Sequence, residues 1–354
     1  MSAFTPGMVC AHHHLYSSLA RGMPGPPTTP TNFSEILRDI WWKLDAVLDQ
    51  EIIYWSAALG AAEALLSGTT SVIDHHESPF CIEGSLDVIA EACDFVGVRH
   101  LLSYGITDRW SDEGALVQVS PSGSMTQAAK RGLEENKRYA LTGRPTMVGV
   151  HAAFTCTDDT LEHAAALSEE LGVGVHIHVA EAPEDANAGA RLEEFARDNW
   201  LLVHAVHLDR HLPGVIAHNP RSNMNNSVGY ARPSLRTNTI VLGTDGIGAD
   251  MLEEFRLSFV RHRDDDRSAT PDNSWKWLQN GNQFFPEALN DKVTWSYDYV
   301  DDPWKVAYTP GIRCVQVEMN GKKVVDNGLP VHFDIQEVRA KASEQAARLF
   351  ERMS

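Results

Sequence analysis

Eight short apolar runs, rich in β-branched residues, recur along this chain and constrain its fold more than any other feature. They cover residues 7–11, 69–74, 99–108, 146–152, 172–180, 200–206, 214–219 and 239–245. Each run is nearly continuous in apolar residues, which is typical of strands that are covered on both faces. Helical patterns separate most of the runs, and this alternation predicts a parallel sheet. Eight such units predict an α/β fold, the (β/α)8 TIM barrel.

The segment after the first run carries an apolar stripe at helical spacing. The stripe consists of Ile36, Leu37, Ile40, Trp41, Leu44, Val47 and Leu48. The helical pattern then resumes and stops at Gly68. We interpret the pair Trp41-Trp42 as packing residues, as we do Trp275 and Trp277. The connections after the sixth and seventh runs are too short to predict full helices there.

The alternation of apolar runs and helical patterns ends near residue 267. This boundary predicts two units, a metal-dependent barrel over residues 1–266 and a smaller unit over 267–354. Residues 292–297, 312–319 and 322–325 are predicted strands, and Asn320-Gly321 is a strong hairpin turn between the last two. A closing helix is predicted from Asp334. The tail is therefore expected to be a small β element, incomplete as a sandwich, with a packing helix.

Composition excludes several classes of partner. The chain has 354 residues and a formal net charge of −18, so nucleic acid and anionic membranes would repel it. Its five cysteines are widely spaced and contain no CxxC pair, which indicates neither a disulfide framework nor a zinc ribbon. No apolar stretch has the length of a membrane span, and the N-terminus lacks a leader pattern. We expect a cytoplasmic protein.

Imidazole and carboxyl groups stand where several apolar runs end, and this pattern indicates a metal site. Side chains alternate across a strand, so His12 and His14 project to one side. His176 and His178 have the same spacing and could supply a third ligand, with Asp245 as a fourth. Nitrogen and carboxylate ligands with room for water describe a catalytic zinc-type site at the mouth of a barrel.

Other polar groups at strand ends suit catalytic or substrate-binding roles. Glu181, three residues beyond His178, is placed to shuttle protons between water and substrate. His204 could orient the attacking water or polarise a leaving group. His151 and the pair His75-His76 suit substrate contacts. Asn223, in the polar loop 221–226, is a further candidate for substrate binding, although the same loop fits a plain turn equally well.

As an ordered set, these motifs resemble the amidohydrolase superfamily. The matching segments are Pro6-Gly7-Met8-Val9 before His12-x-His14, then His178-x-x-Glu181, His204 and Gly243-Thr244-Asp245. The similarity is to its branch of cytosine deaminases, guanine deaminases and chlorohydrolases. Residues 219–226 and 243–251 look like the aminohydrolases called SsnA. Members of that branch usually carry part of a β-sandwich ahead of the Pro-Gly pair, whereas this chain begins close to it.

The resemblance implies a set of roles. His12, His14, His178 and Asp245 would bind one metal ion, usually zinc, with iron or manganese as alternatives. Glu181 would be the proton shuttle, His204 would lie near the attacking water and His151 would contact substrate. His176 would then be a neighbour of the metal and not a ligand. No Lys ends the fourth strand, which favours a mononuclear site, and a homodimer is common in the branch.

Our hypothesis is therefore a zinc-dependent aminohydrolase that deaminates a small nitrogen heterocycle of purine, pterin, pyrimidine or triazine type. Metal-bound hydroxide would attack the amino-bearing carbon, Asp245 would accept its proton and ammonia would leave. A second hypothesis keeps the site but hydrolyses a ring amide or chloride. A third is a non-catalytic metal- or ligand-binding relative, against which the presence of both Glu181 and Asp245 argues.

Overall fold

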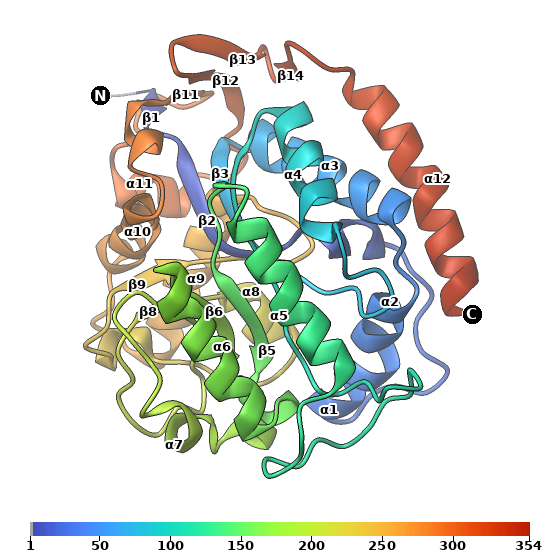
Figure 1. Cartoon of the computed structure of the whole chain (residues 1–354). Helices are drawn as coiled ribbons and strands as arrows, with labels where there is room; N and C mark the ends of the chain where they lie inside the picture. The colour runs from blue at the N-terminus through green and yellow to red at the C-terminus, as the bar shows by residue number, and fades with distance from the viewer. Residues whose placement is uncertain (1–2) are drawn as a thin grey trace.

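The computed structural model describes residues 3–354 and contains the predicted barrel (Figure 1). Its eight strands are β2 (Met8–His14), β3 (Thr69–His76), β4 (Arg99–Tyr104), β5 (Val148–Ala152), β6 (Val175–Val179), β7 (Leu201–His204), β8 (Val215–His218) and β9 (Ile240–Leu242). Neighbours in this order pair in parallel, and single bridges such as Leu102 to Thr146 connect β4 to β5. A short strand, β10 (Asp245–Gly246), pairs with β2 and closes the ring.

Several strands are shorter than predicted because the backbone turns sharply at their carboxyl ends. Ala180, His204 and Asp245 have positive φ angles of 48°, 69° and 63°. Such left-handed conformations are costly for residues other than glycine and interrupt the extended backbone. Ala180 directly follows β6, His204 is the last residue of β7, and Asp245 is the first residue of β10, beyond the end of β9. All three lie at the end of the barrel where the polar groups gather.

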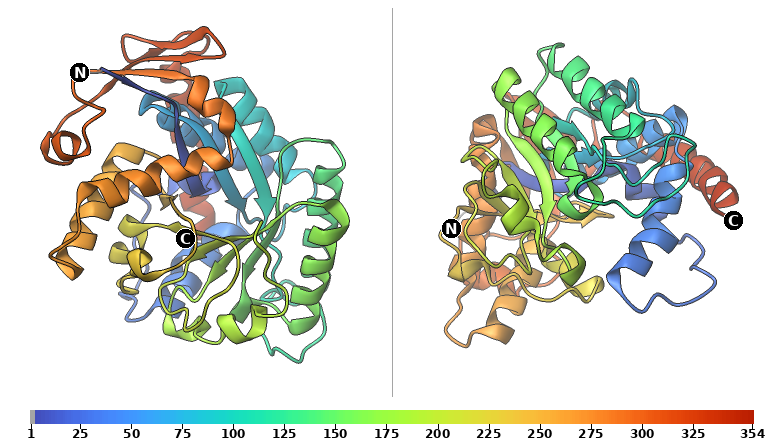
Figure 2. Two further views of the ribbon diagram at one scale, coloured as in Figure 1. Left: turned by 90° about the vertical axis from the view of Figure 1, so that its left-hand side faces the viewer. Right: turned by 60° about the horizontal axis from the view of Figure 1, so that its bottom comes forward.

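Regular helices cover the first half of the barrel more fully than the second (Figure 2). The longer helices are α3 (Gln50–Leu66), α4 (Ser85–Val96), α5 (Gln127–Ala140), α6 (Asp158–Leu171), α9 (Met251–Asp265) and α10 (Pro271–Asn280). After β6 and β8 stand only the short α7 (Ala188–Leu192) and α8 (Pro220–Asn225). Short turns complete the connections: η3 (Ala153–Thr155), η4 (Pro183–Asp185), η5 (Pro233–Leu235), η6 (Gly281–Gln283) and η7 (Pro286–Asn290).

The apolar stripe after the first strand does not form one helix. The chain runs through η1 (Leu15–Ala20), α1 (Phe33–Ile36), the π-helical turn η2 (Leu37–Trp41) and α2 (Trp42–Ala46). Phe33 and Leu37 pack against Ala182 and Val228, which belong to loops at the carboxyl ends of other strands. We call residues 33–46 the lid segment, because Phe33 and Leu37 pack against these loops at the mouth of the barrel; α1 lies at the lower right of Figure 1.

The C-terminal part forms a second, antiparallel sheet at the opposite end of the barrel (Figure 1). Its strand order is β1 (Phe4–Thr5), β11 (Lys292–Trp295), β12 (Cys314–Met319), β13 (Lys322–Asp326) and β14 (Leu329–Pro330). β1 thus joins the N-terminal residues to the tail. After β11 comes α11 (Pro303–Tyr308), and the closing helix α12 (Ile335–Met353) begins after Asp334 and packs on α3, where Arg348 pairs with Asp49.

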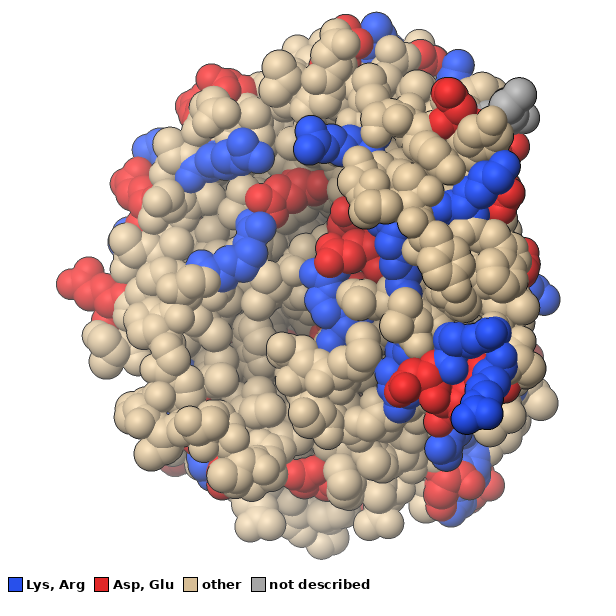
Figure 3. Space-filling view, turned by 180° about the vertical axis from the view of Figure 1, so that it is seen from behind, with Lys and Arg blue, Asp and Glu red and all other residues tan. Residues whose placement is uncertain are grey.

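Charged side chains of both signs are interspersed on the surface. On the face seen in Figure 3, Lys and Arg lie beside Asp and Glu rather than in a patch of one sign. Exposed pairs such as Arg131–Glu83 and Lys137–Glu170 follow this pattern. Within residues 3–354, no helix has the length and apolar character needed to cross a membrane.

Candidate active site

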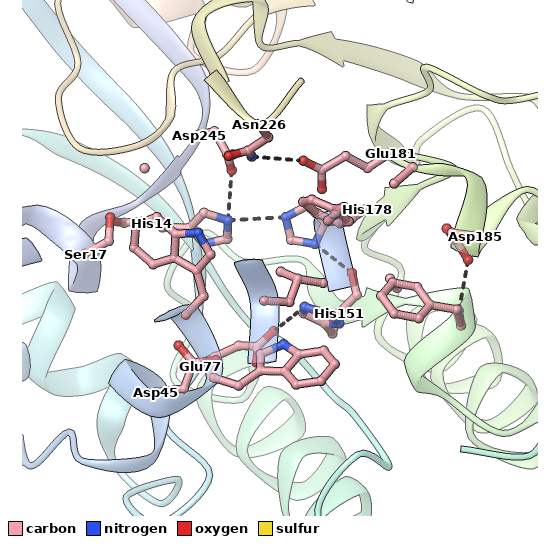
Figure 4. A pocket seen from close by; sticks show the side chains of 18 of the residues that line it. His14, Ser17, Asp45, Glu77, His151, His178, Glu181, Asp185, Asn226 and Asp245 are labelled. Carbon is pink, nitrogen blue, oxygen red and sulfur yellow. Dashed lines mark hydrogen bonds and ion pairs between the residues drawn. The ribbon is translucent and has the colours of Figure 1, made fainter. Parts of the chain in front are cut away.

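The barrel strands bring together all four residues expected to bind metal. His12 and His14 come from β2, His178 from β6 and Asp245 from β10. Figure 4 shows His14, His178 and Asp245 facing one another. Asp245 Oδ1 lies 3.0 Å from His12 Nε2 and 3.1 Å from His14 Nε2. His14 Nε2 is 3.2 Å from His178 Nε2. Ligand atoms bound to one tetrahedral zinc ion stand about 3.4 Å apart, so this spacing fits a single cation.

The hydrogen bonds of the Nδ1 atoms show that the Nε2 atoms of these histidines are arranged as metal ligands. His14 Nδ1 donates to the backbone carbonyl of His75 at 2.6 Å, and His178 Nδ1 donates to that of His151 at 2.6 Å. A carbonyl oxygen only accepts, so in each neutral ring the lone pair is left on Nε2. His12 Nδ1 instead faces His176 Nε2 at 2.8 Å. The donor set therefore fits a divalent metal ion.

The electrostatics of the cluster favour positive charge at the same point. Burial alone would raise the pKa of the Asp245 carboxyl, but hydrogen bonds from His12 and His14 outweigh it and hold this pKa well below its usual range. Burial opposes a proton on His14, yet the Asp245 carboxylate overcomes it and raises the His14 pKa to about 9. Ser222 Oγ donates to the other carboxylate oxygen, Oδ2, at 2.5 Å. A proton or a cation is thus stabilised between Asp245 and the imidazoles.

Glu181 and His204 lie next to the cluster, as expected of a proton shuttle and its partner. Glu181 Oε2 is 3.4 Å from His204 Nε2. Burial raises the pKa of the Glu181 carboxyl to about 7, although His204 opposes the shift. A carboxyl with a pKa near neutrality can both give and take a proton at physiological pH. His204 Nδ1 donates to Asn223 Oδ1 at 2.8 Å, which fixes its ring.

The three candidates for substrate contact are placed differently. His151 lines the cavity, with Nε2 3.5 Å from Glu77 Oε1. His76 does not: it points away from the cluster and bonds Ser78 Oγ at 2.8 Å, because alternation along β3 turns His75 inward instead. Asn223 is buried behind His204, and Asn226, one helical turn later, lines the cavity in its place.

A cavity opens above the cluster, and the lid segment forms much of its apolar wall. The lid segment contributes Phe33, Leu37, Trp41 and Trp42 to that wall, and η3 contributes Phe154. Trp41 and Trp42 do pack against apolar neighbours, as interpreted from the sequence, but they also line the cavity, which the sequence interpretation did not include. The sequence feature that could have indicated this is their position in the connection after the first barrel strand, which leaves the barrel at the end where active sites form.

A buried ion cluster beside the lid was not predicted from the sequence. Arg109 Nη2 contacts both Glu77 Oε2 and Asp45 Oδ2, the latter at 2.6 Å. Burial raises the pKa of both carboxyls, that of Asp45 to about 8, while Arg109 opposes the shift. Asp45 Oδ1 and Glu77 Oε1 have no hydrogen-bond partner among the described residues, and both carboxyl groups line the cavity. The cluster thus places two buried carboxyl oxygens, both without hydrogen bonds within residues 3–354, beside the cavity, and Glu77 Oε1 lies 3.5 Å from His151 Nε2.

Comparison with known proteins gives the family. The model of the Amidohydrolase family matches residues 3–279. The chain belongs to the amidohydrolase family. It is 30% identical over 394 residues to a 5-methylthioadenosine/S-adenosylhomocysteine deaminase of Syntrophomonas wolfei, with 97% of this chain and 86% of that protein covered. It is also 30% identical over 283 residues to a 5'-deoxyadenosine deaminase of Methanopyrus kandleri, covering 73% of this chain and 61% of that protein.

Solved structures show the same fold. A zinc-bound adenosine deaminase from Xanthomonas campestris superposes with a TM-score of 0.80 at 19% identity, covering 98% of this chain and 85% of that one. Atrazine chlorohydrolase from Arthrobacter aurescens superposes with a TM-score of 0.74 at 19% identity, covering 97% and 88%. The predicted family, barrel fold and enzyme class, a metal-dependent hydrolase of carbon–nitrogen bonds that deaminates a nitrogen heterocycle, are confirmed.

Proposed function

We propose that this protein is a zinc-dependent deaminase of an aminopurine ring that carries a sugar-like substituent. The observation that carries the proposal is the placement of Glu181, with a pKa of about 7, beside three imidazole Nε2 atoms and Asp245 at the floor of one cavity. His12, His14, His178 and Asp245 would hold the ion. A bound zinc ion would supply Lewis acidity and lower the pKa of water at the site.

The protein's own groups divide the proton transfers. Asp245 accepts a proton from the attacking water, and Ser222 orients its carboxylate through Oδ2. His204 Nε2 is buried 3.4 Å from Glu181 Oε2 and makes no hydrogen bond among the described residues, so this atom can steady the water oxygen. Glu181 donates its proton to the ring nitrogen and then helps the amino group leave. The net reaction consumes one water and releases ammonia.

The cavity walls suit a heterocycle with hydroxyl groups. Trp41, Trp42 and Phe154 offer aromatic faces to a flat ring. The unpartnered oxygens Asp45 Oδ1 and Glu77 Oε1 can accept hydrogen bonds from the hydroxyls of a sugar. The names of the relatives, which are deaminases of adenosine derivatives, support the same substrate class.

The test is ammonia release from a panel of substrates: adenosine, 5'-deoxyadenosine, 5'-methylthioadenosine, guanine, a pterin, cytosine and a chlorotriazine. We expect release from an adenosine derivative. Glu181→Gln should lower turnover by about 10²–10⁴-fold while one zinc per chain stays bound, because the ligands are untouched. Glu193→Gln, an exposed carboxyl paired with Arg210, is the matched control.

Each other outcome contradicts the proposal in a different way. Unchanged activity of Glu181→Gln removes the shuttle role. Release of chloride instead of ammonia supports the hydrolysis of a ring substituent, and bound zinc without any turnover supports a binding protein.

We also propose that the protein is located in the cytoplasm and forms a homodimer. All five cysteines are unpaired, and all but Cys81 are buried, as is common in a reducing compartment. Measurement of the molecular mass in solution tests the dimer.

A further inference from the structure

Among the three histidines expected to bind the metal, His12 is held in a different way. The Nδ1 atoms of His14 and His178 donate to backbone carbonyls, which can only accept a hydrogen bond. His12 Nδ1 faces a side chain instead, the imidazole of His176, whose Nε2 lies 2.8 Å away. A neutral imidazole nitrogen either donates or accepts, so His176 alone leaves the direction of this bond open.

Ser103 removes that ambiguity. Its Oγ lies 3.0 Å from the other ring nitrogen of His176, Nδ1. The same Oγ is 3.0 Å from the backbone oxygen of Asp74, which is an acceptor. A serine hydroxyl has one hydrogen, and the carbonyl takes it. Ser103 must therefore accept from His176, and His176 Nδ1 must carry the proton.

The remaining directions follow in order. His176 is fully buried, and its hydrogen-bond partners among the described residues are His12 and Ser103, with no carboxylate. A cationic ring without a counter-charge would be costly there, so His176 is neutral and its Nε2 accepts. His12 Nδ1 then donates to it. His12 Nε2 and Asp245 Oδ1 lie 3.0 Å apart and share a proton in a hydrogen bond. A cation that replaces this proton is bound by the Nε2 lone pair, because the other proton of His12 is already held on Nδ1.

We propose that Ser103 and His176 are positioning residues that select the metal-binding tautomer of His12. The inference rests on the proposed metal site. Residues from four strands contribute, because His12 lies on β2, His176 on β6, Ser103 on β4 and Asp74 on β3. All four are fully buried, so solvent does not compete for these hydrogen bonds. Ser103 and the Asp74 carbonyl, acting through His176, thus keep the proton of His12 on Nδ1. A single backbone carbonyl does the same for His14 and for His178.

The first test measures zinc affinity by competition with a chelator, without substrate. Ser103→Ala frees His176 to turn its proton toward His12, and we expect the zinc dissociation constant to rise about 10–100-fold. Ser103→Thr keeps the hydroxyl and should restore wild-type affinity. Ser258→Ala is the matched control, since that buried hydroxyl bonds Ser274 on the outer helices. Wild-type affinity in Ser103→Ala, or equal loss in the control, overturns the proposal.

The second test reads the tautomers in the unmodified protein, and variants serve only to assign the signals. Nitrogen-15 NMR of the zinc-loaded protein, assigned with His12→Asn and His176→Asn, should show both rings protonated on Nδ1. Protonation of His176 on Nε2 overturns the proposal. Neither readout involves turnover, so a failure of the proposed deaminase activity is seen separately, in the ammonia assay.

Discussion

The two walls of the cavity are built in opposite ways. The metal-binding wall consists of side chains at strand ends, where His12 and His178 are buried and their ring nitrogens are hydrogen-bonded. The lid segment presents mainly apolar side chains to the cavity from short helical pieces, including a π-helical turn. One of the few hydrogen bonds between this segment and the opposite rim is donated by Ser34 Oγ to Glu184 Oε1 at 3.1 Å. The contrast suggests that the first wall sets the chemistry and the second sets which ring enters.

The largest expected effect is on the metal-binding wall. His178→Asn removes one nitrogen ligand and should lower both zinc content and kcat/KM, the latter by about a thousand-fold, roughly 4 kcal/mol of transition-state stabilisation. Metal analysis and steady-state kinetics measure this, with His163→Asn, an exposed histidine on α6, as the control. Full zinc content with full activity in His178→Asn would show that the wall does not work through a metal.

A second change, on β3 behind the metal-binding wall, tests a buried carboxyl. Burial raises the pKa of Asp74 to about 7, against a hydrogen bond from the Leu15 N–H. The folded state thus holds a proton up to about pH 7, whereas the unfolded chain loses it near pH 4. The free energy of unfolding of the wild type should therefore fall as pH rises through this window, relative to Asp74→Asn, by roughly 1–3 kcal/mol in total.

Denaturant unfolding at pH 4.5, 6 and 8 checks this prediction. Asn keeps the acceptor for Leu15 and does not titrate, so it imitates the protonated acid. A stability difference between the two proteins that stays constant with pH would show that Asp74 is already ionised in the folded state.

The lid should respond in substrate binding and not in chemistry. Trp42→Ala removes part of the aromatic wall, and we expect KM to rise about tenfold, roughly 1.4 kcal/mol, with kcat and zinc content unchanged. Trp304→Ala, at a half-exposed tryptophan on α11, is the matched control. A loss of kcat with unchanged KM would contradict the assignment of chemistry to the metal-binding wall and of substrate binding to the lid segment.

The smallest effect is expected where the lid segment joins the barrel. Asp49 caps α3 by accepting from Ile52 N at 2.9 Å, and it pairs with Arg348 and Arg352 of α12. Asp49→Ala should cost about 1 kcal/mol of stability in thermal or denaturant unfolding. Kinetic constants should stay at wild-type values, and a changed KM would reveal coupling between this junction and the lid.

Most of the barrel and its strand ends could be predicted because these features are local. A buried parallel strand is a short apolar run, and the eight runs anticipate β2 to β9, although the turns after β6, β7 and β9 shorten them. Alternation along β2 places His12 and His14 on one side. The ordered motifs then indicate His178, Glu181, His204 and Asp245, and the structure brings all of them to one mouth.

Other features depended on contacts that no local pattern encodes. The lid stripe has the spacing of a core helix, and only its position over the mouth makes Trp41 and Trp42 part of the cavity. Arg109, Asp45 and Glu77 are far apart in the chain and meet by folding. Asn223 and Asn226 lie one helical turn apart. The loop sequence could not show that Asn223 bonds His204 whereas Asn226 lines the cavity.

The sequence by itself determined the barrel, the family and the residues at its strand ends, because strand periodicity and motif order are carried by neighbouring residues. The tertiary structure alone decided how each imidazole is held. His12 depends on His176, Ser103 and the carbonyl of Asp74, which come from three other strands. The direction of a hydrogen bond between two side chains is settled by the partners that each also has, and those partners exist only in the folded chain.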